Sequence, residues 1–305
     1  MRPLKFHPIL KQTLWGGERI IPYKELASGL SRVGESWELS GMPGSESVVA
    51  EGPWAGSTLS ELIGRFGAEL LGKANYARFG QEFPLLVKFI DAREDLSIQV
   101  HPDDELARKR HGKSGKCEMW YVLEAEPGAS LLTGFSRPIA PAEYERRVAD
   151  NTLTDVLNRQ AIASGDVFYL PAGRVHSIGK GSFIVEIQQS SDITYRIYDF
   201  DRRDAAGNSR ELHTELAREA IDFESSENSR ITYAPENNQE VRLVTTPYFT
   251  TSLYTLTART RCDWSATDSF VAIVLLQGSG SLTDNEGNRI DVRQGETWLL
   301  PASTQ

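Results

Sequence analysis

Short apolar segments follow one another along most of the chain, and each is bounded by Gly, Pro, Asn or Asp. They are rich in β-branched and aromatic side chains, which is typical of β-strands. The pattern predicts strands over Ser47–Val49, Leu85–Asp91, Leu96–His101, Glu118–Leu123, Val167–Leu170, Phe183–Gln188, Val241–Val244, Phe249–Thr257, Phe270–Leu276, Arg289–Val292 and Thr297–Leu300.

Helical patterns are few. Thr58-Leu-Ser-Glu61 has the spacing of a capping box and predicts a helix over Leu59–Leu71. Further helices are predicted over Pro141–Ala149, Thr154–Asn158 and Glu211–Phe223. Because long helices between the strands are rare, the pattern favours a mainly β sandwich or barrel over a parallel sheet built from βαβ units.

A weak internal repeat divides the chain. Gly165-Asp-Val-Phe-Tyr-Leu-Pro-Ala-Gly173 resembles Gly295-Glu-Thr-Trp-Leu-Leu-Pro-Ala-Ser303, and only the first copy continues to a histidine, His176. The stretch 224–230 between them is polar and unpatterned. We therefore predict a first domain over residues 1–223, a linker over 224–240 and a second, all-β unit over 241–305.

Composition narrows the class of protein. A chain of 305 residues, 25% charged and 40% hydrophobic, is ordinary for a globular protein of about two domains. The net charge of −9 argues against nucleic-acid or anionic-membrane partners, whereas an anionic small molecule stays open. The longest apolar run, Phe270–Leu276, is far shorter than the ~20 residues that span a bilayer.

The cysteines point to a reducing compartment. Cys117 and Cys262 are the only two and lie far apart in sequence, so a disulfide framework is not expected and a cytoplasmic location is favoured. Neighbouring residues of a strand face opposite ways, so Cys117 is predicted to face away from Glu118 as a buried structural thiol.

Four polar residues have the types and spacing of metal ligands. Gln99 and His101 stand two apart at a strand end and share a face, Glu118 begins another strand, and a Pro-Gly turn presents His176. Two imidazoles, a carboxylate and an amide oxygen suit a divalent transition metal. This donor set is compatible with Zn²⁺, Mn²⁺, Fe²⁺, Co²⁺ and Ni²⁺ alike.

The motifs around these residues carry a family resemblance. The Gly-x5-Pro-x-Gly-x-x-His segment resembles the second cupin motif, and Gln99-x-His101 stands where cupins usually have His-x-His. With the segments that follow, the chain resembles the type I phosphomannose isomerases in their shorter bacterial form, over about residues 5–300. The matching segments are Leu14-Trp-Gly-Gly17, Gly34-Glu-Ser-Trp-Glu38, Pro84-Leu-Leu-Val-Lys-Phe-Ile-Asp91, Gly115-Lys-Cys-Glu-Met-Trp-Tyr-Val-Leu123 and Glu186-Ile-Gln-Gln-Ser-Ser-Asp-Ile-Thr-Tyr-Arg-Ile-Tyr-Asp199.

The resemblance implies a fold and a cofactor. The fold would be a mainly β, double-stranded β-helix (cupin) sandwich with two cupin units and a small helical insertion around the first. One Zn²⁺ per chain would be bound at the positions that match the family's ligands, namely Gln99, His101, Glu118 and His176.

The resemblance also implies an activity, the interconversion of mannose 6-phosphate and fructose 6-phosphate through a cis-enediol. Arg196 matches the family's catalytic arginine and would stabilise negative charge, because a guanidinium stays protonated. Its structural alternative is an ion pair with Asp192, Asp199 or Asp201. Glu186 matches an active-site glutamate and is a candidate acid or base.

Three further residues are candidates for the site. Lys116 shares the face of Glu118, and Lys88 lies between apolar neighbours, so it must either snorkel or face a polar cleft, where it would bind an anion or have a depressed pKa. Ser97 could hydrogen-bond a phosphate. We expect Lys88, Lys116 and Arg196, together with the metal ion, to form a local cationic pocket. The group that removes the C2 proton stays open between Lys116, Glu186 and a metal-bound water.

Two readings from other classes compete with the isomerase. A non-catalytic cupin that senses a sugar phosphate would be expected to lack Arg196 or a metal ligand, and none is lacking. An iron-dependent cupin oxidoreductase is disfavoured by Gln99, because such sites generally use a histidine-rich set.

Overall fold

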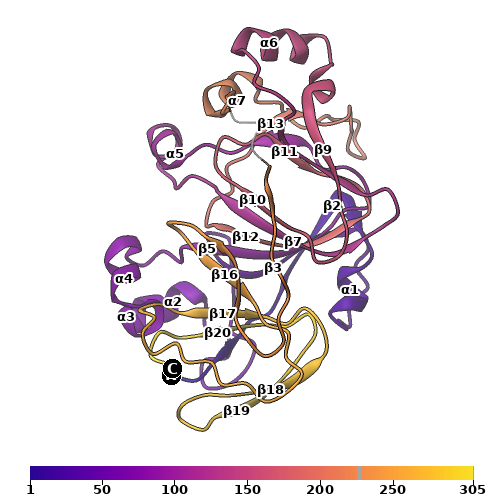
Figure 1. Cartoon of the computed structure of the whole chain (residues 1–305). Helices are drawn as coiled ribbons and strands as arrows, with labels where there is room; N and C mark the ends of the chain where they lie inside the picture. The colour runs from indigo at the N-terminus through magenta and orange to yellow at the C-terminus, as the bar shows by residue number, and fades with distance from the viewer. Residues whose placement is uncertain (225–227, 305) are drawn as a thin grey trace.

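The structure, a computed structural model that describes residues 1–224 and 228–304, is built mainly from antiparallel strands (Figure 1). The largest sheet has eight strands in the order β14-β10-β7-β12-β5-β3-β2, with β4 paired to β3. Their bounds are β2 Ile9–Gly17, β3 Val33–Met42, β4 Ser45–Glu46, β5 Leu85–Asp91, β7 Glu118–Ala125, β10 Val167–Leu170, β12 Ser182–Gln189 and β14 Arg230–Ile231.

A second sheet of five strands packs on the first. Its order is β13-β6-β11-β8-β9. Buried side chains of both sheets share one apolar cluster, in which Trp120 and Phe168 of the large sheet join Leu131 and Ile178 of the smaller one. The predicted mainly β sandwich is therefore confirmed. The bounds are β6 Ile98–Val100, β8 Ser130–Phe135, β9 Leu157–Ala161, β11 His176–Ile178 and β13 Tyr195–Tyr198.

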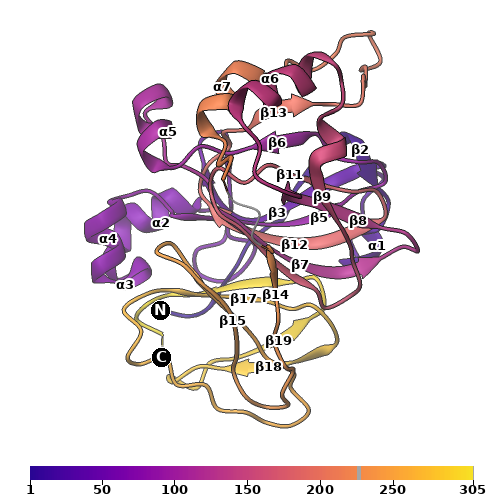
Figure 2. The same ribbon diagram turned by 45° about the horizontal axis from the view of Figure 1, so that its top comes forward.

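The C-terminal residues form smaller sheets beside this sandwich (Figure 2). The first strand of the chain, β1, pairs with the last, β20, so the two termini lie side by side, and the Thr304 hydroxyl donates to the Met1 carbonyl. The predicted boundaries at 223 and 240 stay a prediction, and linker residues 225–227 lie outside the described residues. The bounds are β1 Leu4–Lys5, β15 Val241–Thr245, β16 Thr250–Leu253, β17 Val271–Val274, β18 Ser279–Thr283, β19 Arg289–Arg293 and β20 Thr297–Leu300.

The two copies of the sequence repeat have the same hydrogen-bonded framework. Gly165 and Gly295 both have positive φ, and each donates its N–H at 2.8 Å to a carbonyl of the segment paired beside it, Val122 and Leu275 respectively. Strand β10 or β20 follows, and each ends in a Pro-Ala turn. The two segments are thus similar in structure as well as in sequence.

The second copy has lost the polar chemistry of the first. Leu170 of β10 pairs with Glu118, and Leu300 at the equivalent place in β20 pairs with Val271. An apolar side chain therefore stands where the first copy has a carboxylate.

The helices differ from the predictions in identifiable ways. The capping box of Thr58 and Glu61 is present, but the helix predicted over Leu59–Leu71 is broken at Gly67, whose φ is +47°, into α2 (Leu59–Phe66) and α3 (Ala68–Leu71). The helix predicted over Thr154–Asn158 is a short 3₁₀ helix over Leu153–Val156, and its predicted end at Asn158 was wrong because strand β9 begins at Leu157.

The remaining helices lie at the edges of the sandwich (Figure 1). The helix predicted over Pro141–Ala149 is confirmed as α6, and the one predicted over Glu211–Phe223 is the shorter α7 (Thr214–Ala220). The others are α1 (Ile20–Tyr23), α4 (Lys73–Phe79) and α5 (Asp104–His111). No helix within the described residues is long and apolar enough to cross a membrane.

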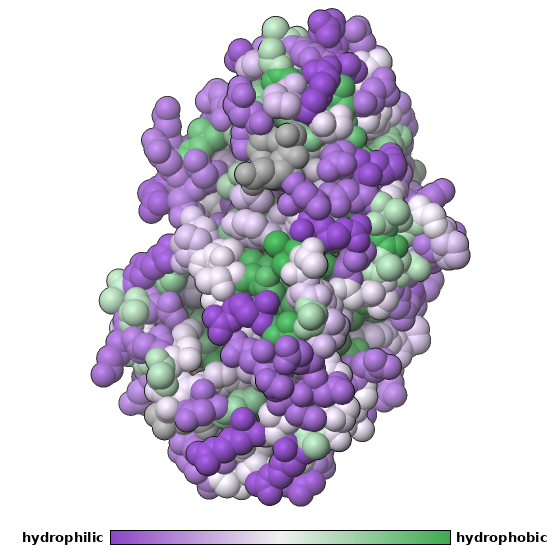
Figure 3. Space-filling view, in the orientation of Figure 1, coloured by the Kyte–Doolittle hydropathy of each residue, from purple (hydrophilic) through white to green (hydrophobic). Residues whose placement is uncertain are grey.

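One apolar cluster joins the large sheet to the C-terminal residues. Cys117 is 2% exposed, with Met119 in the cluster that also contains Leu243 and Leu299 of the C-terminal residues, so the predicted buried thiol is confirmed. On the face shown in Figure 3, hydrophobic residues gather near the middle, between the more hydrophilic upper and lower ends.

A buried ion pair also joins the sandwich to the C-terminal residues. Lys24, directly after α1, lies with its Nζ 2.9 Å from Glu38 of β3 and donates to the carbonyl of Gly295. The Ser36 hydroxyl donates to the other oxygen of Glu38 at 2.6 Å. Strand β3 was not predicted because its buried polar residues hide the alternation that identifies a strand.

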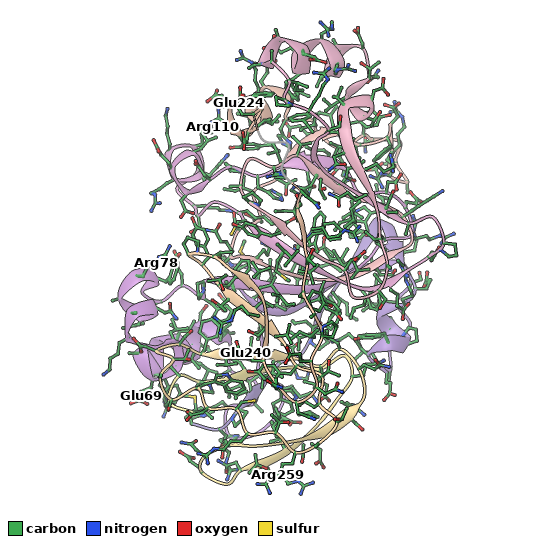
Figure 4. The ribbon with its side chains drawn as sticks, viewed as in Figure 1. Glu69, Arg78, Arg110, Glu224, Glu240 and Arg259 are labelled. Atoms are coloured by element: carbon green, nitrogen blue, oxygen red, sulfur yellow. The ribbon has the colours of Figure 1, made fainter. Side chains whose placement is uncertain are left out.

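We expect Glu38→Ala to lower the free energy of unfolding by about 3–5 kcal/mol, because it leaves the Lys24 ammonium buried without its partner. Urea unfolding measures the change. Arg242→Ala is the matched control, since it breaks an exposed pair with Glu240 (labelled in Figure 4) and should cost less than about 0.5 kcal/mol. Equal losses in the two variants would contradict the role given to Lys24.

Candidate functional site

A row of polar side chains lies across the five-stranded sheet. Arg196 of β13 pairs with Gln99 of β6, and Gln99 pairs with His176 of β11. Residues directly opposite in antiparallel strands project from the same face, so the three side chains lie in a row. His101, two residues after Gln99, extends the same face.

A second row lies on the large sheet. Trp120 of β7 pairs with Glu186 of β12, which pairs with Lys88 of β5. Glu118, two residues before Trp120, shares their face. The Trp120 ring meets His176 edge to face with 5.5 Å between centroids, so the two rows face each other between the sheets.

Glu118 lies between two buried histidines. Its carboxylate oxygens are 3.5 Å from His101 Nε2 and 3.3 Å from His176 Nε2. One ligand atom from each residue lies within 4.8 Å of the others, and each side chain is at most 2% exposed. These three residues form a cluster that could hold a metal ion.

Backbone carbonyls fix the orientation of both imidazoles. His101 Nδ1 lies 2.8 Å from the carbonyl of Ile193, and His176 Nδ1 lies 2.8 Å from the carbonyl of Arg174. A carbonyl only accepts hydrogen bonds, so each Nδ1 carries a proton and donates it. Each Nε2 lone pair is therefore turned toward Glu118, as in histidines that bind metals.

The electrostatics keep these groups in the protonation states that metals bind. Burial and the charge of Lys116 lower the pKa of His101 to about 3, and burial lowers the pKa of His176. Burial alone would raise the pKa of Glu118, but the charge of Lys116 and the interactions with His176 and His101 outweigh it and hold that pKa well below its usual value. The cluster thus offers neutral imidazoles and an ionised carboxylate.

Unpartnered acceptors indicate that the cluster fits a cation. Within the described residues, His101 Nε2 and Glu118 Oε1 are buried and receive no hydrogen bond. Burying acceptors without a donor is costly, and a divalent metal ion would satisfy both atoms at once.

Gln99 adds a fourth group at the edge of the cluster. Its Nε2 lies 3.3 Å from His176 Nε2, and its Oε1 accepts from the Ser97 hydroxyl at 3.1 Å. A half-turn of the amide exchanges its oxygen and nitrogen, which brings an oxygen ligand to the cluster. All four predicted metal ligands are therefore brought together, with Ser97 directly beside them.

The acid and base candidates form a connected pair next to the cluster. Lys116 Nζ is 3.0 Å from Glu118 Oε2 and 4.0 Å from Glu186 Oε1. Glu186 is held from two other sides, by Lys88 Nζ at 3.0 Å and by the indole N–H of Trp120 at 2.9 Å. The side chain of Glu186 is 4% exposed, so Glu186 is not a solvated carboxylate at the end of a strand.

Both lysines of the predicted cationic pocket have carboxylate partners in the structure. Lys88 faces Glu186 and, at 3.9 Å, Glu35, while Lys116 faces Glu118, so carboxylates balance both lysines. A depressed pKa for Lys88 was wrong. Burial lowers its pKa, but the Glu186 and Glu35 charges more than offset this effect and raise it above the usual value.

Unbalanced positive charge lies instead around Arg196. Its Nη1 donates to the carbonyl of Glu211 at 2.8 Å, and among the described residues its buried Nε has no hydrogen-bond partner. Burial and the nearby charge of Arg210 lower the pKa of Arg196. The alternative ion pair with Asp199 is taken by two other arginines, Arg202 at 2.7 Å and Arg210 at 2.5 Å.

Sequence reasoning missed Arg202 and Arg210. The available signal was the density of arginines shortly after Arg196, but their convergence on Asp199 depends on how the loop after β13 folds. Arg210 and Glu35 also line a cleft of about 560 Å³ together with Gln12, Thr13, Leu14, Trp15 and Arg32. Because Glu35 reaches Lys88, this cleft adjoins the polar row of the large sheet.

Comparisons with known proteins agree with this geometry. Residues 4–132 match the family described as phosphomannose isomerase type I, catalytic domain. A probable mannose-6-phosphate isomerase of Bacillus subtilis is 34% identical over 303 residues, which cover 98% of this chain and 93% of the relative. The mannose-6-phosphate isomerase of Streptococcus mutans is 33% identical over 98% of this chain and 92% of its own length.

Solved structures show the same fold. The crystal structure of mannose 6-phosphate isomerase from Bacillus subtilis superposes with a TM-score of 0.89 at 30% identity, over 99% of this chain and 94% of that one. A mutant phosphomannose isomerase from Salmonella typhimurium superposes with a TM-score of 0.79 at 16% identity, over 100% and 96% of the two chains, which supports the fold alone.

Glu118→Ala should weaken divalent-metal binding by roughly 10- to 100-fold or more, because both imidazoles face this carboxylate. Metal bound per chain after dialysis, measured by elemental analysis, tests the prediction. Glu124→Ala is the control, since Glu124 lies on the same strand with an exposed side chain. Unchanged metal content in Glu118→Ala would rule out the cluster as the metal site.

Proposed function

The chain belongs to the type I phosphomannose isomerase family, and on that premise we propose that it interconverts mannose 6-phosphate and fructose 6-phosphate. The reaction moves a proton between C2 and C1 of the sugar. One observation carries the proposal: the buried cluster of His101, Glu118 and His176 adjoins the linked pair of Lys116 and Glu186.

We assign the metal to Gln99, His101, Glu118 and His176, with one Zn²⁺ per chain. The orphaned acceptors and the mixed nitrogen and oxygen donors support this assignment. When bound, the ion would supply Lewis-acid polarisation of the sugar's carbonyl and hydroxyl oxygens.

The arginines supply the anion-binding charge. Arg196, Arg202 and Arg210 carry three positive charges, against the carboxylate of Asp199 and the exposed carboxylate of Glu211, and this excess suits the phosphate and the enediolate of the substrate. We assign charge stabilisation to Arg196. Ser97 and Lys88 are assigned to substrate binding, because Ser97 lies beside Gln99 and Lys88 keeps its charge beside the cleft.

We assign the proton transfer to Lys116 and Glu186. Lys116 Nζ and Glu186 Oε1 are 4.0 Å apart, so both can reach the same pair of sugar carbons, where one group would accept the proton from C2 and a proton would be returned to C1. Lys88 and Trp120 hold Glu186 in place, and Glu118 holds Lys116. Lys88, which the Glu186 and Glu35 charges keep protonated, does not act as the base.

Two features support a cytoplasmic location and a small-molecule substrate. Cys117 and Cys262 are both free thiols, which suits the reducing cytoplasm. The negative net charge suits a small-molecule substrate bound in a local positive site better than a nucleic-acid partner.

We expect the purified protein to form fructose 6-phosphate from mannose 6-phosphate in a coupled assay, to lose this activity on chelation and to regain it with Zn²⁺. The same experiment separates the competing readings. Bound zinc without turnover would favour a non-catalytic sensor, and bound iron with oxygen uptake would favour an oxidoreductase.

Arg196→Ala should lower kcat by roughly 100- to 1,000-fold while metal content stays unchanged, because the variant removes charge stabilisation but none of the proposed metal ligands. Arg196→Lys should not restore the rate, since an ammonium lacks the planar fork of a guanidinium. Steady-state kinetics with elemental analysis provide the measurement, and exposed Arg203→Ala is the control. Normal turnover in Arg196→Ala would remove Arg196 from the mechanism.

A further inference from the structure

The backbone that carries Lys116 is held by hydrogen bonds at three consecutive residues. The N–H of Gly115 donates to Asp104 Oδ1 at 2.8 Å, and the N–H of Lys116 donates to the carbonyl of Pro102 at 3.0 Å. The N–H of Cys117 donates to Gln189 Oε1 at 2.8 Å. Two of the three acceptors are side chains, so a substitution can remove them.

The two side-chain acceptors also bind each other. Gln189 Nε2 donates to Asp104 Oδ1 at 3.0 Å, and the hydroxyl of Tyr248 donates to Asp104 Oδ2 at 2.9 Å. Burial alone would raise the pKa of Asp104, but the bonds from Gly115, Tyr248 and Gln189 outweigh it and lower that pKa. The carboxylate of Asp104 therefore accepts three hydrogen bonds, two on Oδ1 and one on Oδ2.

Helix capping does not explain this arrangement. Asp104 is the first residue of α5, but Asp103 is the N-cap, and its side chain accepts from the N–H of Leu106 at 2.8 Å. The approach of the Lys116 segment also requires glycine, because a Cβ at Gly115 would lie 2.4 Å from the carbonyl carbon of Asp103. The contact is close and specific.

Tyr248 extends the network to the C-terminal residues. It lies between β15 and β16, and Arg78 of α4 (labelled in Figure 4) donates to the neighbouring carbonyl of Pro247 at 2.9 Å. The Arg78 guanidinium also lies over the Tyr248 ring, 5.4 Å from its centroid. Asp104 is thus itself held in place from two parts of the chain.

We propose that Asp104 and Gln189 are positioning residues that fix Lys116 for proton transfer, an inference that rests on the proposed isomerase function. A lysine side chain is flexible, so the place of its ammonium depends on how firmly its backbone is held. Displacement of a catalytic group by about 1 Å costs on the order of 100-fold in rate. Glu118 is anchored separately, because it belongs to the β7 ladder and pairs with Leu170 and Gln188.

This separation gives a distinctive expectation for Asp104→Ala. The kcat should fall roughly 10-fold or more, with KM within about 3-fold and metal content unchanged, since Lys116 is loosened while the metal ligands stay in place. Asp104→Asn should recover most of the rate. Its amide oxygen can still accept from Gly115 and Gln189, and its NH₂ can donate to the Tyr248 oxygen.

Asp103→Ala is the matched control on the same helix. It removes the N-cap of α5 and lowers the melting temperature but leaves the hydrogen bonds of Gly115–Cys117, so kcat should be unchanged. A loss of kcat in Asp103→Ala equal to that in Asp104→Ala would overturn the proposal, as would a loss of metal that accounts for the rate in Asp104→Ala.

A double-mutant cycle tests whether Asp104 acts through Lys116. In a Lys116→Ala background, adding Asp104→Ala should change the residual rate less than about 2-fold, whereas full additivity of the two losses would overturn the proposal. Isomerase turnover of the unmodified enzyme distinguishes a failure of the proposed function from a failure of the positioning role of Asp104. No isomerase turnover there would overturn both the function and the positioning role, while normal turnover with an unaffected Asp104→Ala variant would overturn only the positioning role.

Discussion

Two imidazoles and a carboxylate are buried with their lone pairs directed at one another, and much of the surrounding structure serves to hold them there. Without a cation, such an arrangement is unfavourable, because buried acceptors lack donors. It is maintained by groups that cannot easily move: the carbonyls of Ile193 and Arg174 hold the two rings, and the β7 ladder holds Glu118. The sandwich thus provides a rigid frame for a cation.

The balance of positive and negative side chains changes from the histidine–glutamate cluster to Arg196. Near the cluster, the lysines and carboxylates balance, with Lys116 and Lys88 each facing a glutamate. Around Arg196 the balance shifts, because Arg202 and Arg210 both pair with Asp199, a carboxylate that could otherwise have paired with Arg196. A protein of net charge −9 therefore keeps its positive excess where an anionic substrate would need it.

Residues 295–303 repeat the hydrogen-bonded framework of residues 165–173 without the paired carboxylate. Val271 replaces Glu118 at the equivalent strand position, while the glycine turns and their hydrogen bonds are retained. The C-terminal residues still contact the site indirectly, since Tyr248 binds Asp104 and the Gly295 carbonyl accepts from Lys24. The second copy stabilises the first rather than duplicating it.

The sequence by itself determined the mainly β class, the capping box and the four metal-ligand candidates, because each depends on residue types at short, fixed spacings. Only the tertiary structure decided the partners of Lys88, the arginines around Asp199 and the hold of Asp104 and Gln189 on the Lys116 backbone. Strand β3 and the break at Gly67 also escaped prediction. For the side-chain partners the physical reason is the same: local spacing fixes which face a side chain occupies, whereas its charge partners and hydrogen-bond donors come from other strands, helices and loops that only folding brings together.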